Sequence, residues 1–241
     1  MIDVHPPHQP VHAWKDFLIH MSAICLGLLI AIGLEQVVEI IHHHNQVVEA
    51  RKALSDEQTA NEQLFARRTK SFRAETGKYQ NNLAVLLFLQ KHPGAPSAQW
   101  PGTVNWHSLG GRFNDSAWAT IERSNVTDLL PQAEVRRADR LYKELAAEDA
   151  THAQLLDAIR EARRYMVVDY DPSHLTPPQL AEAIALAENV LTVQYRLGTE
   201  MRNLNSEYPS FTPAPSTEEL VDIMHEPHQL TALPTVTDAP K

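Results

Sequence analysis

Histidine is the residue type most able to support chemistry in this chain. The sequence has 13 histidines, and six of them lie in two groups that flank an apolar stretch. The second group follows Glu39 with the Glu-x-x-His spacing of carboxylate-bridged di-iron helices, because positions i and i+3 share one helix face. This spacing makes a metal site one hypothesis, with Glu39, His42, His43 and His44 as candidate ligands. The first group consists of His5, His8 and His12.

A di-iron site needs two such motifs and two further glutamates from facing helices. The other near matches, Asp149-x-x-His152 and Asp222-x-x-His225, use aspartate and are scattered along the chain. Solvated or interfacial histidines are therefore the alternative, with pH sensing as a further role because histidine titrates near neutrality. No glycine-rich nucleotide loop, nucleophile elbow or zinc-protease motif occurs, so we predict no catalytic residues and no cofactor, and an enzyme is unsupported.

Charge and cysteine content exclude several other classes. The formal net charge is −9, which argues against nucleic acid as a partner, since nucleic-acid surfaces depend on clustered lysine and arginine. The single cysteine, Cys25, lies inside the apolar stretch. The rest of the chain therefore lacks the thiols needed for disulfides, cysteine-ligated zinc or a cysteine nucleophile.

The apolar stretch is the strongest signal in the sequence. Residues 17–34 contain no Asp, Glu, Lys or Arg, and 18 helical residues reach roughly 27 Å, close to the hydrocarbon thickness of a bilayer. We predict a transmembrane helix over residues 17–38, with Trp14 and Lys15 as interfacial anchors. A cleaved signal peptide competes with this prediction, but no small-x-small site follows Leu34. A buried core helix is a third interpretation, although such helices rarely lack a polar face.

The predicted span bears on orientation and association. Lysine and arginine are almost equally placed on its two sides, and the short N-terminal segment 1–16 leads us to expect a cytoplasmic N-terminus and a periplasmic C-terminal domain. Ala23, Gly27 and Ala31 form a small-xxx-small ridge that lets two helices approach closely. The ridge indicates either packing between spans or merely the usual abundance of small residues in such helices.

A long helix is expected to continue outward from the membrane. No proline or strong turn signal occurs before His92-Pro93-Gly94, and aromatic and leucine residues recur every seven positions on one stripe. A second set keeps 3- and 4-residue steps nearer the membrane. Pairing between chains and packing on later helices would both use these apolar residues. The stripe consists of Phe65, Phe72, Tyr79 and Leu86, and the second set of Leu34, Val38, Ile41 and Val48, with Asn45 among them.

The remaining pattern predicts an all-α extramembrane domain over residues 39–209, an irregular bundle of the long helix with two or three others. Residues 92–115 contain three glycine or proline breakers and two tryptophans, which indicates a long loop with buried content. Helices are expected at 116–123, at 132–166 and after Thr176, where Thr, Pro and Gln form a helix start. Residues 210–241 are punctuated by proline and are interpreted as a tail with a possible short helix at 217–225.

Five segments have a distinctive sequence: Trp14-Lys-Asp-Phe17, the run from Gly27 to Gln36, the three histidines 42–44, Phe113 to Trp118, and Leu129-Leu-Pro131. Together they resemble a group of uncharacterised bacterial single-pass membrane proteins. These segments cover about a tenth of the chain. It implies an inner-membrane helical protein and supplies no activity.

Three functions fit these observations. The first is a non-enzymatic accessory or scaffolding subunit of a membrane complex, which contacts the lipid bilayer and either oligomerises with itself or docks on a partner membrane protein. The second is a sensor with a helical ligand-binding domain, although the 16 residues before the span are too few for a signalling domain. The third is a histidine-based metal-binding protein.

Overall fold

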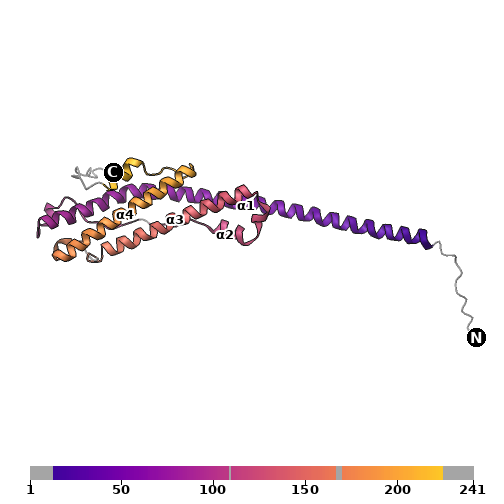
Figure 1. Cartoon of the computed structure of the whole chain (residues 1–241), viewed down its shortest axis with the longest axis horizontal. Coiled ribbons are helices and arrows are strands. Elements are labelled where there is room, and N and C mark those ends of the chain that lie inside the picture. Colours follow the sequence, from indigo (N-terminus) through magenta and orange to yellow (C-terminus); the bar gives the residue numbers. More distant parts are fainter. Residues whose placement is uncertain (1–12, 109, 167–169, 225–241) are drawn as a thin grey trace, which may run out of the picture.

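The computed structural model describes residues 13–108, 110–166 and 170–224. These residues form helices joined by irregular connections, with no β-strand in the described ranges, which confirms the predicted all-α class. Its dominant element is α1, Ala13–Lys91, a single helix of 79 residues that is roughly 120 Å long. Figure 1 shows α1 running through the bundle and projecting far beyond it toward the N-terminus. The predicted continuation of the apolar helix into a long outer helix is therefore confirmed.

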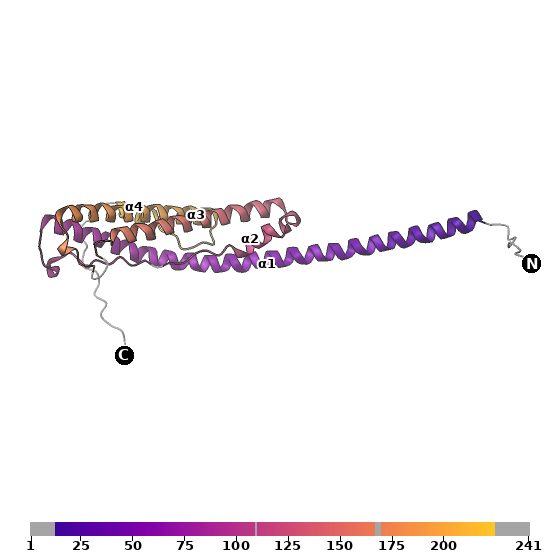
Figure 2. The same cartoon turned by 90° about the horizontal axis from the view of Figure 1, so that it is seen from below.

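The bundle core consists of the C-terminal half of α1, α3 (Gln132–Ala162) and α4 (Pro177–Glu207). In both Figure 1 and Figure 2, α3 lies along α1 in the same direction, and α4 returns antiparallel to both. Arg51 pairs with Glu134 and Arg68 with Glu148, so α3 advances in the same direction as α1. Phe72 lies against Gly198 and Thr76 bonds Gln194, so α4 runs in the opposite direction.

The stripe predicted at seven-residue spacing forms the centre of this core. Phe65, Phe72, Tyr79 and Leu86 are all at most 4% exposed. Seven residues are close to two helical turns, so the four side chains follow one face of α1. The packing of these large apolar side chains against α3 and α4 supplies most of the stability of such a bundle.

The shorter elements close the two ends of the bundle. α2 (Ser116–Arg123) and the 3-10 turn η2 (Val126–Leu129) cover α1 at the end nearer the apolar segment. α4 begins where predicted: the backbone N–H of Thr176 donates to the Gln179 side chain at 3.0 Å, and Pro177 occupies the first helical position. α3 ends at Ala162, a few residues before the predicted end at Met166. The 3-10 turns η1 (Ser97–Gln99) and η3 (Pro172–His174) lie in the connections.

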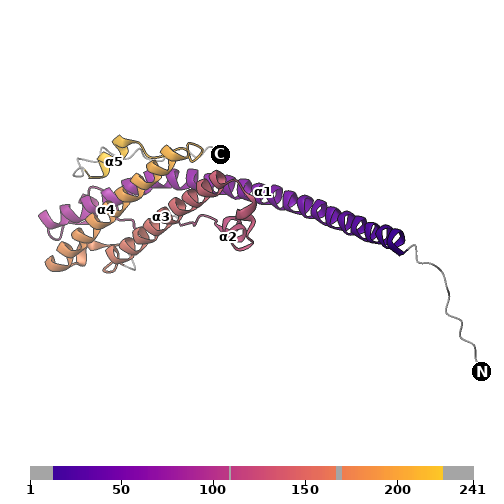
Figure 3. The same cartoon turned by 45° about the vertical axis from the view of Figure 1, so that its right-hand side comes forward.

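The segment after Tyr208 contains the short helix expected near 217–225, but it packs on the bundle instead of forming a tail. Figure 3 shows α5 (Thr217–Met224) lying over α4, and Phe211, Leu220 and Ile223 are at most 3% exposed. The helical domain therefore extends to at least Ile223. The sequence of this segment is rich in proline and polar residues, so its three buried apolar side chains form no periodic pattern. Their burial depends on tertiary contacts, which the local sequence does not predict.

Candidate functional site

The loop between α1 and α2 returns along α1 from Asn82 to Glu57. From Asn105 to Ser116 it spans 11 residues, and the α1 residues that hold its two ends, Asn82 and Glu57, are 25 positions apart. Eleven extended residues and 25 helical ones both cover roughly 37 Å, so the two segments match in length. The loop is thus a fixed strap that carries α2 back to the end of the bundle nearer the apolar segment.

Polar side chains on one edge of α1 hold this strap. Asn82 and Asn61 each bond one loop residue twice, donating to its carbonyl and accepting from its N–H, at 2.7–2.8 Å. A side-chain amide can make this reciprocal pair because it carries both a donor and an acceptor. Asn61, Arg68, Glu75 and Asn82 are seven residues apart, like the apolar stripe beside them. One edge of α1 therefore packs the core while the other edge pairs the loop.

Arg68 is the centre of this polar edge. Its guanidinium, at 8% exposure, bonds Glu148 at 3.2 Å and Asp149 at 2.6 Å on α3, donates to the carbonyl of Gly111, and lies 4.3 Å from the ring centroid of Phe113. Burial is the main reason that the pKa of Glu148 is raised to about 7, and Arg68 opposes this shift. One adjacent cavity has a volume of only about 20 Å³, and a more open one beside Gly111 and Asp149 has about 380 Å³. Because the Arg68 guanidinium bonds both the loop and α3, the cluster joins loop and helix.

Glu57 caps α2 from across the bundle. Its carboxylate accepts from the backbone N–H groups of Ala117 and Trp118, from the Ser116 hydroxyl, and from the hydroxyl of Tyr142 at 2.7 Å. A negative charge at a helix N-terminus is stabilised by the unpaired N–H groups there. Burial, followed by the bond to Glu57, raises the pKa of Tyr142, so the phenol keeps its proton and remains a donor.

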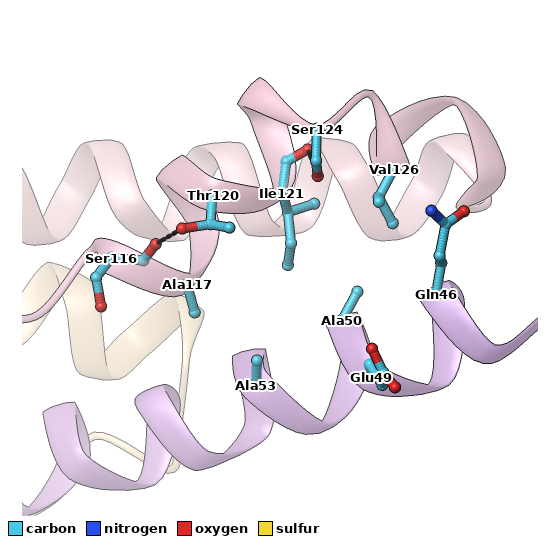
Figure 4. A pocket seen from close by; sticks show the side chains of 10 residues that line it. All are labelled: Gln46, Glu49, Ala50, Ala53, Ser116, Ala117, Thr120, Ile121, Ser124 and Val126. Atoms are coloured by element: carbon cyan, nitrogen blue, oxygen red, sulfur yellow. Dashed lines mark hydrogen bonds between the residues drawn. The ribbon is translucent and has the colours of Figure 1, made fainter. Parts of the chain in front are cut away.

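The cap positions α2 above a groove that is a candidate binding site. Figure 4 shows Ala50 and Ala53 of α1 pointing toward Ala117, Ile121 and Val126 on the facing segment. The groove has a volume of about 390 Å³ and lies where α1 leaves the bundle toward the apolar segment. Small side chains on α1 leave this space open. Gln46, Glu49, Ser116, Thr120 and Ser124 complete the lining.

The chemistry of the groove is that of binding. Its floor is apolar, and Glu49 is the one ionisable side chain among its lining residues. General acid–base catalysis would need a positioned proton donor or acceptor near a second reactive group. The groove instead suits an apolar side chain or a short apolar segment whose polar ends meet the hydroxyls at the rim.

The predicted metal ligands lie together on the surface of α1 without a third partner. Glu39 and His43 are 3.8 Å apart between Oε1 and Nε2, and the rings of His42 and His43 are 6.4 Å apart. Within the described ranges, no group of three or more His, Cys, Asp and Glu side chains is arranged to hold a metal ion. His44 is exposed as well, and His5, His8 and His12 lie outside the described residues. A metal site at this position would therefore need ligands from elsewhere.

The predicted packing ridge is also free. Ala23, Gly27 and Ala31 are exposed on the projecting part of α1, where no described element contacts them. The same holds for Leu34, Val38, Ile41 and Asn45, so packing on later helices is not their role.

Comparisons with protein-family models, with curated proteins and with solved structures gave no match to this chain.

Sequence reasoning missed Glu57 and the polar edge of α1. The signal that could have found them is the seven-residue recurrence of Asn61, Arg68, Glu75 and Asn82, four residues ahead of each member of the apolar stripe. Polar residues that keep register with a core stripe are candidates for buried pairing, because they lie beside the core face of the same helix.

Proposed function

We propose that this chain is a single-pass membrane protein whose helical domain serves as a non-enzymatic accessory or scaffolding subunit of a membrane complex. The main support is that one helix, α1, contains both the apolar segment and the central core residues of the domain. In the best 18-residue window of α1 the mean hydropathy is 2.4, and none of that window is buried inside the protein. Such an apolar surface is stable when lipid covers it.

The geometry of α1 sets how the domain stands relative to the bilayer. If residues 17–34 cross the hydrocarbon core, the first buried residue, Ala50, lies 16 positions or roughly 24 Å further along the helix. This distance exceeds the headgroup layer, so the bundle is held just above the lipid surface. The groove beneath α2 then faces the neighbourhood where domains of other membrane proteins lie.

The location is proposed to be a bacterial inner membrane with the domain in the periplasm. The resemblance to bacterial single-pass proteins and the short N-terminal segment support this choice. A signal sequence and a soluble core helix pass the same hydropathy test. The complete exposure of the apolar segment argues against a core helix. Its continuity with α1, which the bundle needs, argues against a cleaved signal sequence.

The groove supports a second candidate function, a sensor-type ligand-binding domain. A space of about 390 Å³ is within the range of small-molecule sites. Full-length protein in mild detergent would show a ligand-dependent rise in melting temperature if the groove binds a small molecule. Ala53→Trp, which fills the groove from an exposed position on α1, should abolish that rise, whereas Val221→Trp on the exposed face of α5 should not.

The experiment for the leading function is detergent-gentle affinity purification from native membranes, followed by mass spectrometry. A stoichiometric co-purifying membrane protein is the expected result. A homogeneous preparation that contains neither partner nor oligomer would contradict the scaffold role. Alkaline carbonate extraction of the same membranes tests the anchor separately, because an integral protein stays in the pellet.

A further inference from the structure

One apolar face of α1 has no partner in the fold, and it runs from the apolar segment into the domain. Its residues keep alternating steps of three and four over more than three heptads. Each of them is exposed. We name this face the α1 seam; in heptad notation its a positions are Ile24, Ala31, Val38 and Asn45, and its d positions are Gly27, Leu34, Ile41 and Val48.

The α1 seam points away from the bundle. At about 100° per residue, Val48 is roughly 160° around the helix from Ala50, the first core residue. Val48 is 51% exposed, whereas Ala50 is 7% exposed. Val47, whose side chain lies between these two directions around the helix, packs against the core. Figure 2 shows α3 and α4 on one side of α1 only. A second helix can therefore approach the seam without meeting the domain.

We propose that the α1 seam pairs with the same seam of a second copy in a parallel two-stranded coiled coil. A heptad pattern of this kind is the pattern by which helices pack knobs into holes. Leu34 at d with Val38 at a is a two-stranded combination, whereas the β-branched Ile41 and Val48 at d are not specific for two strands. Asn45 at an a position is the strongest indication, because a buried Asn–Asn pair fixes a parallel two-stranded register. Single-span chains in one membrane share one orientation, which makes the parallel arrangement the only one open to two copies.

The flanking positions agree with this register. Parallel pairing places a g residue opposite the e residue of the next heptad on the other helix. His44 and Glu49 occupy these two positions, so the histidine of one copy faces the carboxylate of the other. In the preceding heptad the facing pair is Val37 and His42, which sets no like charges together.

The length of the seam explains why both halves are needed. Outside residues 17–34 the seam covers only Val38 to Val48, about one and a half heptads, which is short for a stable coiled coil in water. Inside that range, small residues at Gly27 and Ala31 permit close approach of the backbones. Anchoring in the same bilayer also raises the local concentration of the second copy. The pairing thus rests on the membrane anchor of the proposed function.

Cysteine cross-linking in native membranes tests the proposal with a matched pair. In a Cys25→Ser background, Ile41→Cys places a thiol in the seam, and Ile40→Cys places the same thiol one position away, off the seam. The two isoleucines are similarly exposed, at 55% and 66%, so neither change disturbs folding. Copper-phenanthroline oxidation and a short bismaleimide are applied to membranes, and the dimer fraction is read on a non-reducing gel.

Strong dimer formation by Ile41→Cys with at least a several-fold lower yield from Ile40→Cys is the expected result. Adding Asn45→Asp would place one carboxylate of each copy opposite the other in the seam. This repulsion should lower the dimer yield of Ile41→Cys several-fold. Equal yields from the two positions would overturn the proposed dimer while the protein remains in the membrane pellet. Protein in the soluble fraction would instead overturn the anchor, and the fractionation therefore separates the two failures.

Discussion

The cap that Glu57 places on α2 gives the sharpest test of how the domain is held together. Glu57→Gln removes the charge at the start of α2 and leaves the Tyr142 hydroxyl with a weaker acceptor. A helix cap contributes about 1 kcal/mol and a hydrogen bond to a charged group about 1.5–3 kcal/mol. Because the glutamine oxygen keeps part of both interactions, we expect a loss of about 2 kcal/mol in unfolding free energy, or roughly 4–8 °C in melting temperature.

Asp56→Asn is the matched control for this prediction. Asp56 is the adjacent residue, carries the same charge and is exposed, whereas Glu57 is 5% exposed. An exposed substitution of this kind should change stability by no more than about 0.5 kcal/mol. Circular dichroism melts of the full chain in mild detergent would compare the two variants.

A double-mutant cycle with Tyr142→Phe isolates the bond itself. The two substitutions should be less than additive by about 1 kcal/mol, because each removes the same interaction. Equal melting temperatures for Glu57→Gln and Asp56→Asn, or full additivity with Tyr142→Phe, would refute the cap.

Three further predictions concern the polar edge and the packing of the bundle. Burial raises the folded-state pKa of Glu148 to about 7 from 4.5, so its neutral carboxyl stabilises the fold fully below pH 4.5, and this stabilisation is lost as the pH rises through 7. In urea unfolding, the stability of Glu148→Gln relative to wild type should therefore increase by about 3 kcal/mol between pH 4.5 and 8. A difference in stability that does not change with pH would contradict this prediction. Gly198→Ala should destabilise the fold by about 1–3 kcal/mol, because the added Cβ would lie 2.4 Å from a methyl of Leu220. The Cβ added by Gly77→Ala has no atom within 4 Å, so this variant should be stabilised by about 0.5–1 kcal/mol. Melting temperatures that shift in the same direction for both variants would contradict this prediction. Asn82→Ala should remove the hydrogen-exchange protection of the backbone N–H that it holds in the strap, and unchanged protection would exclude that bond.

Much of the fold was predictable because it follows from local patterns. The recurrence of Phe65, Phe72, Tyr79 and Leu86 predicted the core face of α1, and Thr176, Pro177 and Gln179 predicted the start of α4. Both depend on residues within a few helical turns of one another. The absence of breakers through Lys91 likewise predicted one uninterrupted helix.

The polar strap and the packed C-terminal segment depend on long-range pairing instead. Glu57 contacts Tyr142 across 85 residues, and Asn61 pairs with a backbone 53 residues away. No local pattern specifies which loop an asparagine will hold. The groove beneath α2 exists only because the strap returns the chain to Ala50 and Ala53, so the candidate site was not accessible to sequence reasoning.

Labelling with a membrane-impermeant maleimide tests whether α1 anchors the domain in the membrane. In a Cys25→Ser background, Ser55→Cys presents one exposed thiol on the domain, and the wild-type Cys25 provides a thiol inside the predicted span. We expect membrane-bound Ser55→Cys to be labelled in intact spheroplasts, whereas Cys25 should resist labelling until the membrane is dissolved. Labelling of Cys25 in intact membranes, or recovery of the protein in the soluble fraction, would contradict the anchor, and labelling of Ser55→Cys only after permeabilisation would contradict the periplasmic placement.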